Sequence, residues 1–282
     1  MPFPWYNSFM KKRIIIVLTI LSLLFSACGI PEPAHTAEKT TVRIAVIDTG
    51  FSSSAIPQHS IVNGKNYLDG ALSTEDTYGH GTAIAYVILE NCPDALLVPL
   101  VSSAFDDGKI IQVENDTLAK IIIDAVDIYE CDIINISAGI ILDKNSIRNA
   151  IQYAEEKGSL VVASVGNDYA DYGEIKYYPA AYPTVLAVGS INKEEKDIST
   201  FSQRGEWVNI YACGEDVTIR TLSGNTRTSN GTSYSAAKIT AYAANIIMQS
   251  ENNLSPSELR QRIAESLETL PDHTKYLPEK HS

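Results

Sequence analysis

Short apolar strands alternate with helix-forming stretches along most of this chain. The first strand, residues 42–47, reads Val-Arg-Ile-Ala-Val-Ile, which is typical of a strand buried on both faces of a parallel sheet. Similar strands are expected at residues 95–100, 133–136, 160–163 and 185–188, with helices at residues 82–90, 117–129 and 145–157. Strand, helix and strand at this spacing connect as right-handed crossovers. The pattern therefore predicts an α/β fold with a parallel sheet covered by helices.

The C-terminal part continues with further strands and two helices. Strands are expected at residues 208–211, 217–222 and 226–229, the last two joined by the turn Ser223-Gly224-Asn225. An Ala-rich stretch predicts a long helix at residues 233–249, and Pro256 suits the first position of a final helix from about Ser255 to about Leu267. We expect one domain at residues 41–270 and a C-terminal tail at residues 271–282.

The N-terminal region has the order of features found in a secretory signal peptide. A basic cluster at residues 11–13 precedes an apolar stretch at residues 14–25, and Ser26 and Ala27 follow it. The apolar stretch is too short to span a bilayer comfortably. The sequence therefore predicts that residues 1–27 are a signal peptide that is cleaved on export.

Cys28 follows the two small residues directly, and this arrangement resembles the lipobox of bacterial lipoproteins. The resemblance implies that the thiol of Cys28 is diacylated and that the chain is anchored to the bacterial cell membrane, facing outside. An ordinary secreted protein with a chance cysteine is the alternative. Residues 28–40 would then be the lipidated cysteine and a tether that contains two prolines.

Composition excludes several classes of protein. The chain has 282 residues of which 45% are hydrophobic, enough for a sizeable core. Its net charge is −12, and removing residues 1–27, which hold three basic groups and no acidic one, lowers it to −15. This charge has the wrong sign for nucleic acid as a partner. No Cys-x-x-Cys pair occurs, and we expect Cys92, Cys131 and Cys213 to be free, buried thiols, although one bridge is possible.

Three residues with complementary chemistry lie where α/β proteins place their functional groups, at strand ends and helix starts. Asp48 ends the first strand in Val-Ile-Asp-Thr-Gly, His80 opens a helix in Gly-His-Gly-Thr, and Ser233 opens another in Gly-Thr-Ser. A serine hydroxyl is a weak nucleophile, so it needs a histidine to take its proton and a carboxylate to orient that histidine. Each motif alone is as typical of a turn or a helix cap, and their order makes the set specific. We expect Gly79 and Gly81 to leave room for substrate beside the imidazole.

Over about residues 42–244 the chain resembles the subtilisin-like serine protease family. Besides the three motifs above, the segments that carry the resemblance are Asn135-Ile136-Ser137-Ala138-Gly139, Ser164-Val165-Gly166-Asn167, Tyr178-Pro179-Ala180, Ala187-Val188-Gly189 and Phe201-Ser202-Gln203-Arg204-Gly205. The resemblance implies a three-layer subtilisin-like α/β fold, with a mainly parallel central sheet flanked by helices. It also implies serine endopeptidase activity on a peptide or protein substrate.

By this resemblance Asp48 orients His80, His80 acts first as general base and then as general acid, and Ser233 attacks the substrate. Asn167 and the backbone N–H of Ser233 would hold the oxyanion. Without the resemblance, Asn167 would be read as a polar turn residue, because Gly-Asn is a common turn pair.

The resemblance also assigns substrate-binding residues. Ser137, Ala138 and Gly139 would pair as a backbone ladder with an extended peptide, although a strand end leading into a loop has the same pattern. The segment Asp106-Asp107-Gly108-Lys109 is either the opposite wall of the cleft, favouring a basic substrate residue, or a solvated surface turn.

The chain departs from the family in a few places. Ala83 and Tyr234 stand where the family usually has His and Met. The short connection after residue 90 lacks the insertion loop that often binds calcium in relatives, so no cofactor is expected and the sequence does not support a calcium site. Only a short tether precedes Thr41, and we expect folding without an N-terminal prodomain unless another protein supplies that help.

These observations favour an extracytoplasmic, lipid-anchored serine endopeptidase that works through an acyl-enzyme, with a processing role such as trimming the leader of a secreted peptide. A catalytically silent member of the family that binds peptides at the cell surface is the main alternative. A solute-binding lipoprotein would account for Cys28 but gives no reason for Asp48, His80 and Ser233.

Overall fold

The structure is a computed structural model that describes residues 41–68, 73–272 and 274–279. The predicted signal peptide, Cys28 and the tether lie outside the described residues. None of the helices in the described part of the chain is long and apolar enough to cross a membrane.

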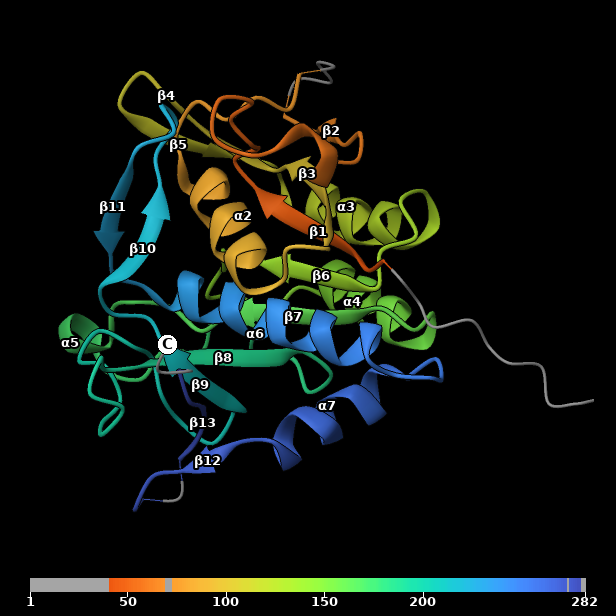
Figure 1. Ribbon diagram of the computed structural model, residues 1–282. Coiled ribbons are helices and arrows are strands. Elements are labelled where there is room, and N and C mark those ends of the chain that lie inside the picture. The colour runs from red at the N-terminus through yellow and green to blue at the C-terminus, as the bar shows by residue number, and fades with distance from the viewer. Residues whose placement is uncertain (1–40, 69–72, 273, 280–282) are drawn as a thin grey trace, which may run out of the picture. The chain divides into compact units, whose positions relative to one another are not determined.

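A large, mostly parallel sheet runs through the described residues (Figure 1). Its strands are β1 Arg43–Asp48, β2 Lys65–Asn66, β3 Leu96–Val101, β6 Ile133–Ile136, β7 Leu160–Ser164, β8 Leu186–Ile191, β9 Ile210–Cys213, β12 Glu268–Thr269 and β13 Lys275–Leu277. They lie in the order β12-β13-β9-β8-β7-β6-β1-β3-β2, and only the pair β12 and β13 is antiparallel. The expectation of a mainly parallel sheet is confirmed.

Helices cover both faces of this sheet (Figure 1). They are α2 His80–Asn91, α6 Thr232–Met248 and α7 Pro256–Glu265 on one face, and α3 Asn115–Asp127 and α4 Asn145–Glu156 on the other. Along β1, Ile44 and Val46 belong to the first core and Ala45 and Ile47 to the second, because successive side chains of a strand point to opposite faces. The predicted three-layer α/β fold is therefore confirmed.

Two hairpins and two short helices follow the carboxyl ends of strands of the sheet. The hairpin of β10 Val217–Arg220 and β11 Thr226–Ser229 forms around the predicted turn. A second hairpin, β4 Ser103–Asp106 and β5 Lys109–Gln112, was not expected, and its two turn residues both have positive φ, 44° and 77°. An Asp-Gly pair is the usual sequence for such a turn, so the segment at residues 106–109 is an exposed hairpin tip. The 3-10 helix Gln58–Ser60 and the short helix α5 Tyr169–Tyr172 complete the described elements.

The C-terminal segment differs from the expected tail. Strand β13 pairs in parallel with β9, with Tyr276 opposite Tyr211. Its Tyr276 is buried in a small apolar cluster with Leu270. A single tyrosine and leucine among polar residues do not form a periodic pattern, so tertiary packing and not local sequence makes this segment a strand.

The three described cysteines are free and buried, as expected. Burial raises the pKa of Cys92 to about 11 and that of Cys131 to about 12, and it also raises the pKa of Cys213. Because the thiolate is the reactive form, these thiols are unreactive at neutral pH.

Candidate active site

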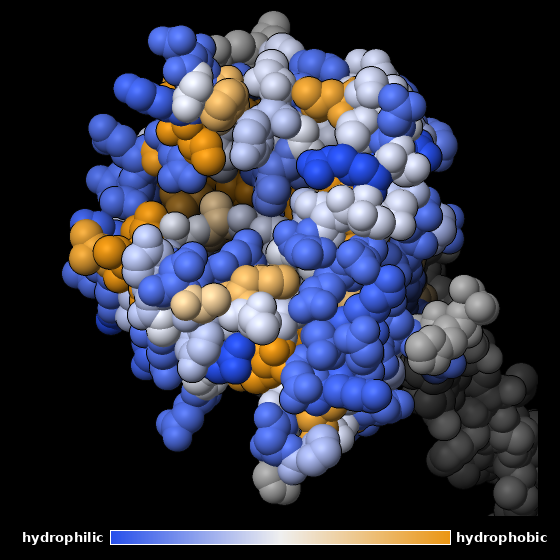
Figure 2. All heavy atoms as spheres, turned by 90° about the vertical axis from the view of Figure 1, so that its left-hand side faces the viewer, coloured by the Kyte–Doolittle hydropathy of each residue, from blue (hydrophilic) through white to orange (hydrophobic). Residues whose placement is uncertain are grey.

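The predicted site residues meet at the carboxyl edge of the sheet. Asp48 is the last residue of β1, Ser137 follows β6, and Asn167 follows β7. These three strands are neighbours in the sheet and run parallel, so their ends lie side by side. Figure 2 faces this edge, and hydrophobic residues surround a hollow in the upper left of the view.

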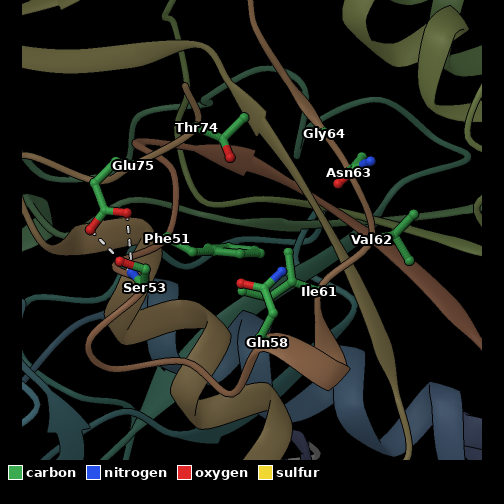
Figure 3. Close-up of a pocket in the computed structure, with 9 residues that line it drawn as sticks. All are labelled: Phe51, Ser53, Gln58, Ile61, Val62, Asn63, Gly64, Thr74 and Glu75. Atoms are coloured by element: carbon green, nitrogen blue, oxygen red, sulfur yellow. Dashed lines mark hydrogen bonds between the residues drawn. The ribbon is translucent and has the colours of Figure 1, made fainter. Parts of the chain in front are cut away.

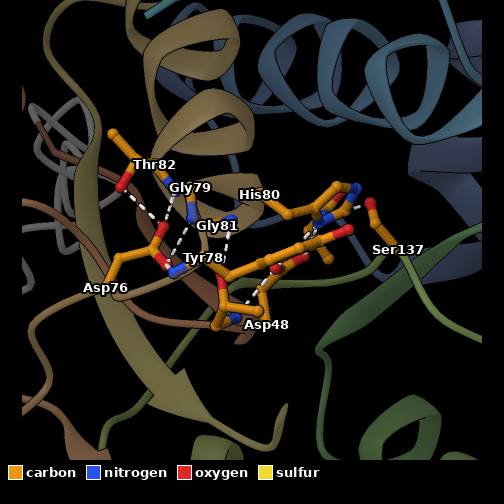
Figure 4. Close-up of polar contacts among 10 residues, drawn as sticks. Asp48, Asp76, Tyr78, Gly79, His80, Gly81, Thr82 and Ser137 are labelled. Carbon is orange, nitrogen blue, oxygen red and sulfur yellow. Dashed lines mark hydrogen bonds and ion pairs between the residues drawn. The ribbon is translucent and has the colours of Figure 1, made fainter. Parts of the chain in front are cut away.

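Asp48 and His80 form a direct pair. Nδ1 of His80 lies 2.8 Å from Oδ1 and 2.9 Å from Oδ2 of Asp48 (Figure 4). Asp48 is 4% exposed and also accepts a hydrogen bond from the backbone N–H of Thr49 at 2.8 Å. The side chain of His80 remains 27% exposed, so its ring is held by the carboxylate on one side and is open to solvent on another.

Gly81 allows this pair to form, which differs from the role we expected for it. A Cβ atom on Gly81 would lie only 2.4 Å from the carbonyl oxygen of Gly50. The backbone N–H of Gly81 also donates to Oγ1 of Thr49 at 2.8 Å. The glycine therefore brings α2 into contact with the end of β1 and sets His80 against Asp48, while its role in making room for substrate stays a prediction.

A second buried carboxylate, Asp76, holds the start of α2 and was missed by the sequence analysis. Its Oδ1 accepts hydrogen bonds from the backbone N–H groups of Tyr78 and Gly79 at 2.9 and 2.8 Å (Figure 4). Its Oδ2 accepts from the backbone N–H and the hydroxyl of Thr82 at 2.9 and 2.7 Å. Asp76 is 4% exposed, and four hydrogen bonds at the positive end of a helix stabilise its charge. An Asp three residues before a glycine that opens a helix was the available signal.

The pKa of His80 is raised above its ordinary value of 6.5. Burial alone would lower this pKa, but the charge of Asp48, its hydrogen bond and the charge of Asp76 outweigh the burial. Both carboxylates therefore stabilise the imidazolium form, which is what a histidine that accepts a proton from a hydroxyl requires.

Ser233 and Asn167 come together through the residue before the serine. Oδ1 of Asn167 accepts hydrogen bonds from the backbone N–H of Thr232 at 2.8 Å and from its hydroxyl at 2.9 Å. Asn167 thereby caps the N-terminus of α6, whose N-cap residue Gly231 has no side chain to do so. Ser233 lies in the first turn of this helix, where backbone N–H groups have no partner within the helix.

Three polar groups at this edge have no hydrogen-bond partner within the described residues: Nε2 of His80, Oγ of Ser233 and Nδ2 of Asn167. The ring of Tyr234, the residue after Ser233, lies 6.4 Å from the ring of His80, centroid to centroid. A Cβ atom on Gly231 would lie 3.6 Å from Nδ2 of Asn167. The start of α6 therefore lies near both His80 and Asn167, and the imidazole nitrogen, the hydroxyl and the amide are unengaged.

The segment Ser137, Ala138 and Gly139 leaves β6 at the same edge. Ala138 and Gly139 are exposed, and their backbone groups form no hydrogen bond with other described residues. Asn135, which is completely buried, donates to Oγ of Ser137 at 3.2 Å and accepts from the hydroxyl of Thr240 at 2.9 Å. This asparagine fixes the exposed segment against α6, and a polar residue inside the apolar strand was the signal for it.

One pocket adjoins the exposed segment, and a second lies further away. An apolar one of about 40 Å³ lies beside Ala138 and Gly139, against the β4–β5 hairpin. A larger one of about 400 Å³ lies beside Phe51, where the backbone N–H of Ser53 donates to both carboxylate oxygens of Glu75 (Figure 3). None of the residues predicted for catalysis lines this larger pocket.

The connection between α2 and β3 offers little for a metal ion. It consists of Cys92, Pro93, Asp94 and Ala95, with one carboxylate. Within the described residues no three His, Cys, Asp or Glu side chains are grouped so that they could hold a metal. The residues of this connection do not fit a calcium site.

Comparisons with known proteins agree with this fold. The model of the subtilase family matches residues 39–278. The chain is 30% identical over 239 residues to the thermophilic serine proteinase of Bacillus sp. (strain AK1), covering 80% of this chain and 56% of the relative. It is also 30% identical over 241 residues to subtilisin DY of Bacillus licheniformis, covering 83% of this chain and 86% of that protein.

A solved structure, the epidermin leader peptide processing serine protease of Staphylococcus aureus, shares the fold. Its TM-score is 0.72 at 22% sequence identity, with 86% of this chain and 76% of that chain covered. The family match extends over most of the chain, from before β1 to the end of β13. The chain belongs to the subtilase family of serine proteases.

Proposed function

We propose that this chain is a serine endopeptidase that hydrolyses peptide bonds through an acyl-enzyme. Asp48, His80 and Ser233 are its catalytic triad, and Asn167 with the backbone N–H of Ser233 forms the oxyanion hole. The observation that carries the proposal is the pairing of His80 Nδ1 with the buried Asp48 carboxylate, which leaves Nε2 unengaged near the start of α6. Family membership supports the same reaction.

The first half of the reaction forms the acyl-enzyme. Nε2 of His80 removes the proton from Oγ of Ser233 while Oγ bonds to the carbonyl carbon, whose oxygen takes up the negative charge. Nδ2 of Asn167 and the N–H of Ser233 donate to that oxygen, and the dipole of α6 adds a favourable potential. The carbon–nitrogen bond then breaks, and the proton on Nε2 passes to the leaving amine.

The second half repeats these steps with water. His80 removes a proton from water, the hydroxide bonds to the acyl carbon, and the proton returns to Oγ of Ser233 as the ester breaks. Asp48 accepts the hydrogen bond from Nδ1–H throughout, so the imidazole keeps the tautomer that presents its lone pair at Nε2.

The substrate lies along the exposed segment after β6. Ala138 and Gly139 offer unpaired backbone groups to an extended peptide, and Ser137 is fixed by Asn135. A peptide can add as a strand only where backbone N–H and C=O groups are unpaired, as they are here. The apolar pocket beside this segment suits a hydrophobic side chain of the peptide.

A fluorophosphonate probe tests the proposed activity, because it reacts with an activated serine and not with an ordinary one. We expect covalent labelling of the wild-type chain and none of Ser233→Ala. Ser235→Ala is the matched control: this serine lies two residues further along α6 and donates to the carbonyl of Ala212, and its loss should leave labelling intact. A wild-type chain that does not label would refute the proposal and favour a silent, peptide-binding member of the family.

We also propose that the enzyme works outside the cytoplasmic membrane, anchored through a lipid on Cys28. The support is the basic, apolar and small-residue order of residues 11–27 followed by that cysteine. Metabolic labelling with a fatty-acid analogue should mark the wild-type chain and not Cys28→Ser. A soluble, unlabelled wild-type product would refute the anchor without touching the catalytic proposal.

A processing role is the narrower part of the proposal. It rests on the compact domain and its short connections, such as the one between α2 and β3. A processing enzyme makes few cuts, so digestion of a denatured protein should give a few long peptides. Extensive degradation into short peptides would contradict this role.

A further inference from the structure

Two glycines flank the place where a substrate side chain has to lie. Gly139 ends the exposed segment after β6, and Gly166 precedes Asn167 in the turn after β7. In the proposed function the substrate backbone pairs with the first segment, and its reacting carbonyl oxygen lies at Asn167. The side chain of the residue before the scissile bond therefore points between Gly139 and Gly166, since β6 and β7 are adjacent.

The ring of Tyr177 occupies the space between these two glycines. A Cβ atom on Gly139 would lie 3.1 Å from Cβ and 3.5 Å from Cδ1 of Tyr177. A Cβ atom on Gly166 would lie 2.8 Å from Cδ2 and 2.9 Å from Cε2 of the same ring. One edge of the ring thus faces each glycine, and the ring fills the volume that the absent side chains leave free.

Polar contacts hold this ring in place. The hydroxyl of Tyr177 donates to Oδ2 of Asp168, and Oδ1 of Asp168 accepts from Nε2 of Gln203 at 2.8 Å. Gln203 is completely buried, and its Oε1 accepts from the backbone N–H of Ile175 at 2.8 Å. The hydrogen bond to Asp168, with burial and the charge of that carboxylate, raises the pKa of Tyr177 to about 12, so the phenol stays a donor at neutral pH.

The backbone next to Tyr177 is also fixed. Tyr178 exchanges two backbone hydrogen bonds with Ile140, at 2.9 and 2.8 Å. This antiparallel bridge ties the segment that carries the ring to the segment that carries Gly139. Rotating the ring aside would break its hydrogen bond to Asp168, and shifting its backbone would strain the neighbouring bridge, so a substrate side chain meets a wall that is held in place.

We propose that Tyr177 is a specificity-determining residue that restricts the position before the scissile bond to glycine, alanine or serine. A larger side chain would overlap the ring, whereas a small one ends before reaching it. The inference rests on the proposed function and adds a substrate class to it: peptides with a small residue on the acyl side of the cleaved bond.

A peptide library derived from digested cell proteins, with cleavage sites read by mass spectrometry, tests the proposal. The wild type should cut after Ala, Gly and Ser at least about tenfold more often than after Leu, Phe or Tyr, because pocket size discriminates by about this factor or more. Tyr177→Ala should reduce that ratio about tenfold or more. Tyr177→Phe keeps the ring and loses only its hydrogen bond to Asp168, so it should reduce the preference much less than Tyr177→Ala does.

Tyr172→Ala is the matched control, because this tyrosine lies in the same connection and is 73% exposed. It should keep the preference as well. A wild-type chain that cuts equally well after large residues overturns the inference, even if Tyr177→Ala fails to fold. Labelling of Ser233 by the fluorophosphonate probe separates the two proposals: labelled enzyme without the preference refutes only the inference, and unlabelled enzyme refutes the proposed function.

Discussion

The N-termini of α2 and α6 are built alike and differ in one property, the charge of the group that caps them. Each helix begins after a glycine with positive φ, Gly79 at 104° and Gly231 at 158°, and neither glycine has a side chain for capping. A residue elsewhere supplies the acceptor in both. For α2 it is the carboxylate of Asp76, and for α6 it is the amide oxygen of Asn167.

The difference matches the charge that develops at each helix. His80, at the start of α2, becomes positive when it takes a proton, and a carboxylate nearby stabilises that form. In the proposed reaction a negative oxygen forms beside Ser233, at the start of α6, and a carboxylate there would oppose it. The neutral amide of Asn167 satisfies the cap with its oxygen and keeps its NH₂ group for the oxyanion. Asn167 would thus serve as the cap of α6 and, in the proposed reaction, as an oxyanion donor.

The largest effect is expected from substitution of Asp48, the carboxylate that pairs with His80 at the start of α2. Asp48→Asn should lower kcat/KM about 10⁴-fold, because an amide no longer fixes the tautomer or stabilises the imidazolium. Peptide hydrolysis at fixed pH measures it. Asp94→Asn, an exposed carboxylate after α2, is the control and should have no effect. A loss of less than tenfold for Asp48→Asn would break the assignment.

Substitutions of Asn167 test the start of α6, where the oxyanion is proposed to form. Asn167→Ala should lower kcat by roughly 10²–10³ with little change in KM, since its donor acts on the developing oxyanion. Asn167→Asp keeps an acceptor for Thr232 but adds a negative charge, so it should lower kcat further. Steady-state kinetics of both variants decides. An aspartate variant more active than the alanine variant would contradict the argument from charge.

Asp76 should have a smaller, pH-dependent effect. Its charge helps to raise the pKa of His80, and the neutral imidazole is the active base, so activity rises as pH increases through that pKa. Asp76→Asn should therefore move the acidic limb of the kcat/KM profile to lower pH, and the looser start of α2 should reduce the plateau about tenfold. Asp116→Asn, an exposed carboxylate in the first turn of α3, should shift nothing. A limb that moves to higher pH would refute the role given to Asp76.

The amino-acid pattern predicted the parts of this site that sit at the ends of regular elements. Asp48, His80 and Ser233 each terminate or open an element, and α/β topology brings such positions to one edge. Asn135 and Asp76 left recognisable signals, a polar residue inside an apolar strand and an aspartate before a helix-opening glycine.

Other features depend on tertiary contacts that local patterns do not contain. Tyr177 matters only because Gly139 and Gly166, distant in the chain, leave space on both sides of it. The role of Gly81 likewise depends on the carbonyl of Gly50. Strand β13 forms because β9 offers a free edge, and the polar residues around Tyr276 gave no periodic signal for it.

The smallest effect is expected from removing the cap of α7. This helix is capped by Ser255, its own N-cap residue, and lies away from the proposed active site, so it is a control for the caps of α2 and α6. Oγ of Ser255 accepts from the backbone N–H of Glu258 at 3.3 Å, and Oε2 of Glu258 accepts from the backbone N–H of Ser255 at 2.8 Å. Ser255→Ala should lower the free energy of unfolding by about 1 kcal/mol, measured by urea denaturation, and leave kcat/KM unchanged.

The side-chain hydrogen bond from Ser255 is the main cause that lowers the pKa of Glu258, so the stabilisation by the carboxylate is present above its ordinary pKa of 4.5 and is lost as pH falls through the lowered value. The stability difference between wild type and Ser255→Ala should shrink in acid accordingly, whereas Ser257→Ala, an exposed neighbour that caps nothing, should show neither effect. If Ser255→Ala also slowed catalysis, a loss of activity on removing the cap of α2 or α6 could not be distinguished from a general effect of losing a helix cap. A pure stability effect would show that loss of a helix cap does not by itself slow catalysis, so a slower Asn167→Ala variant could be attributed to its lost donor.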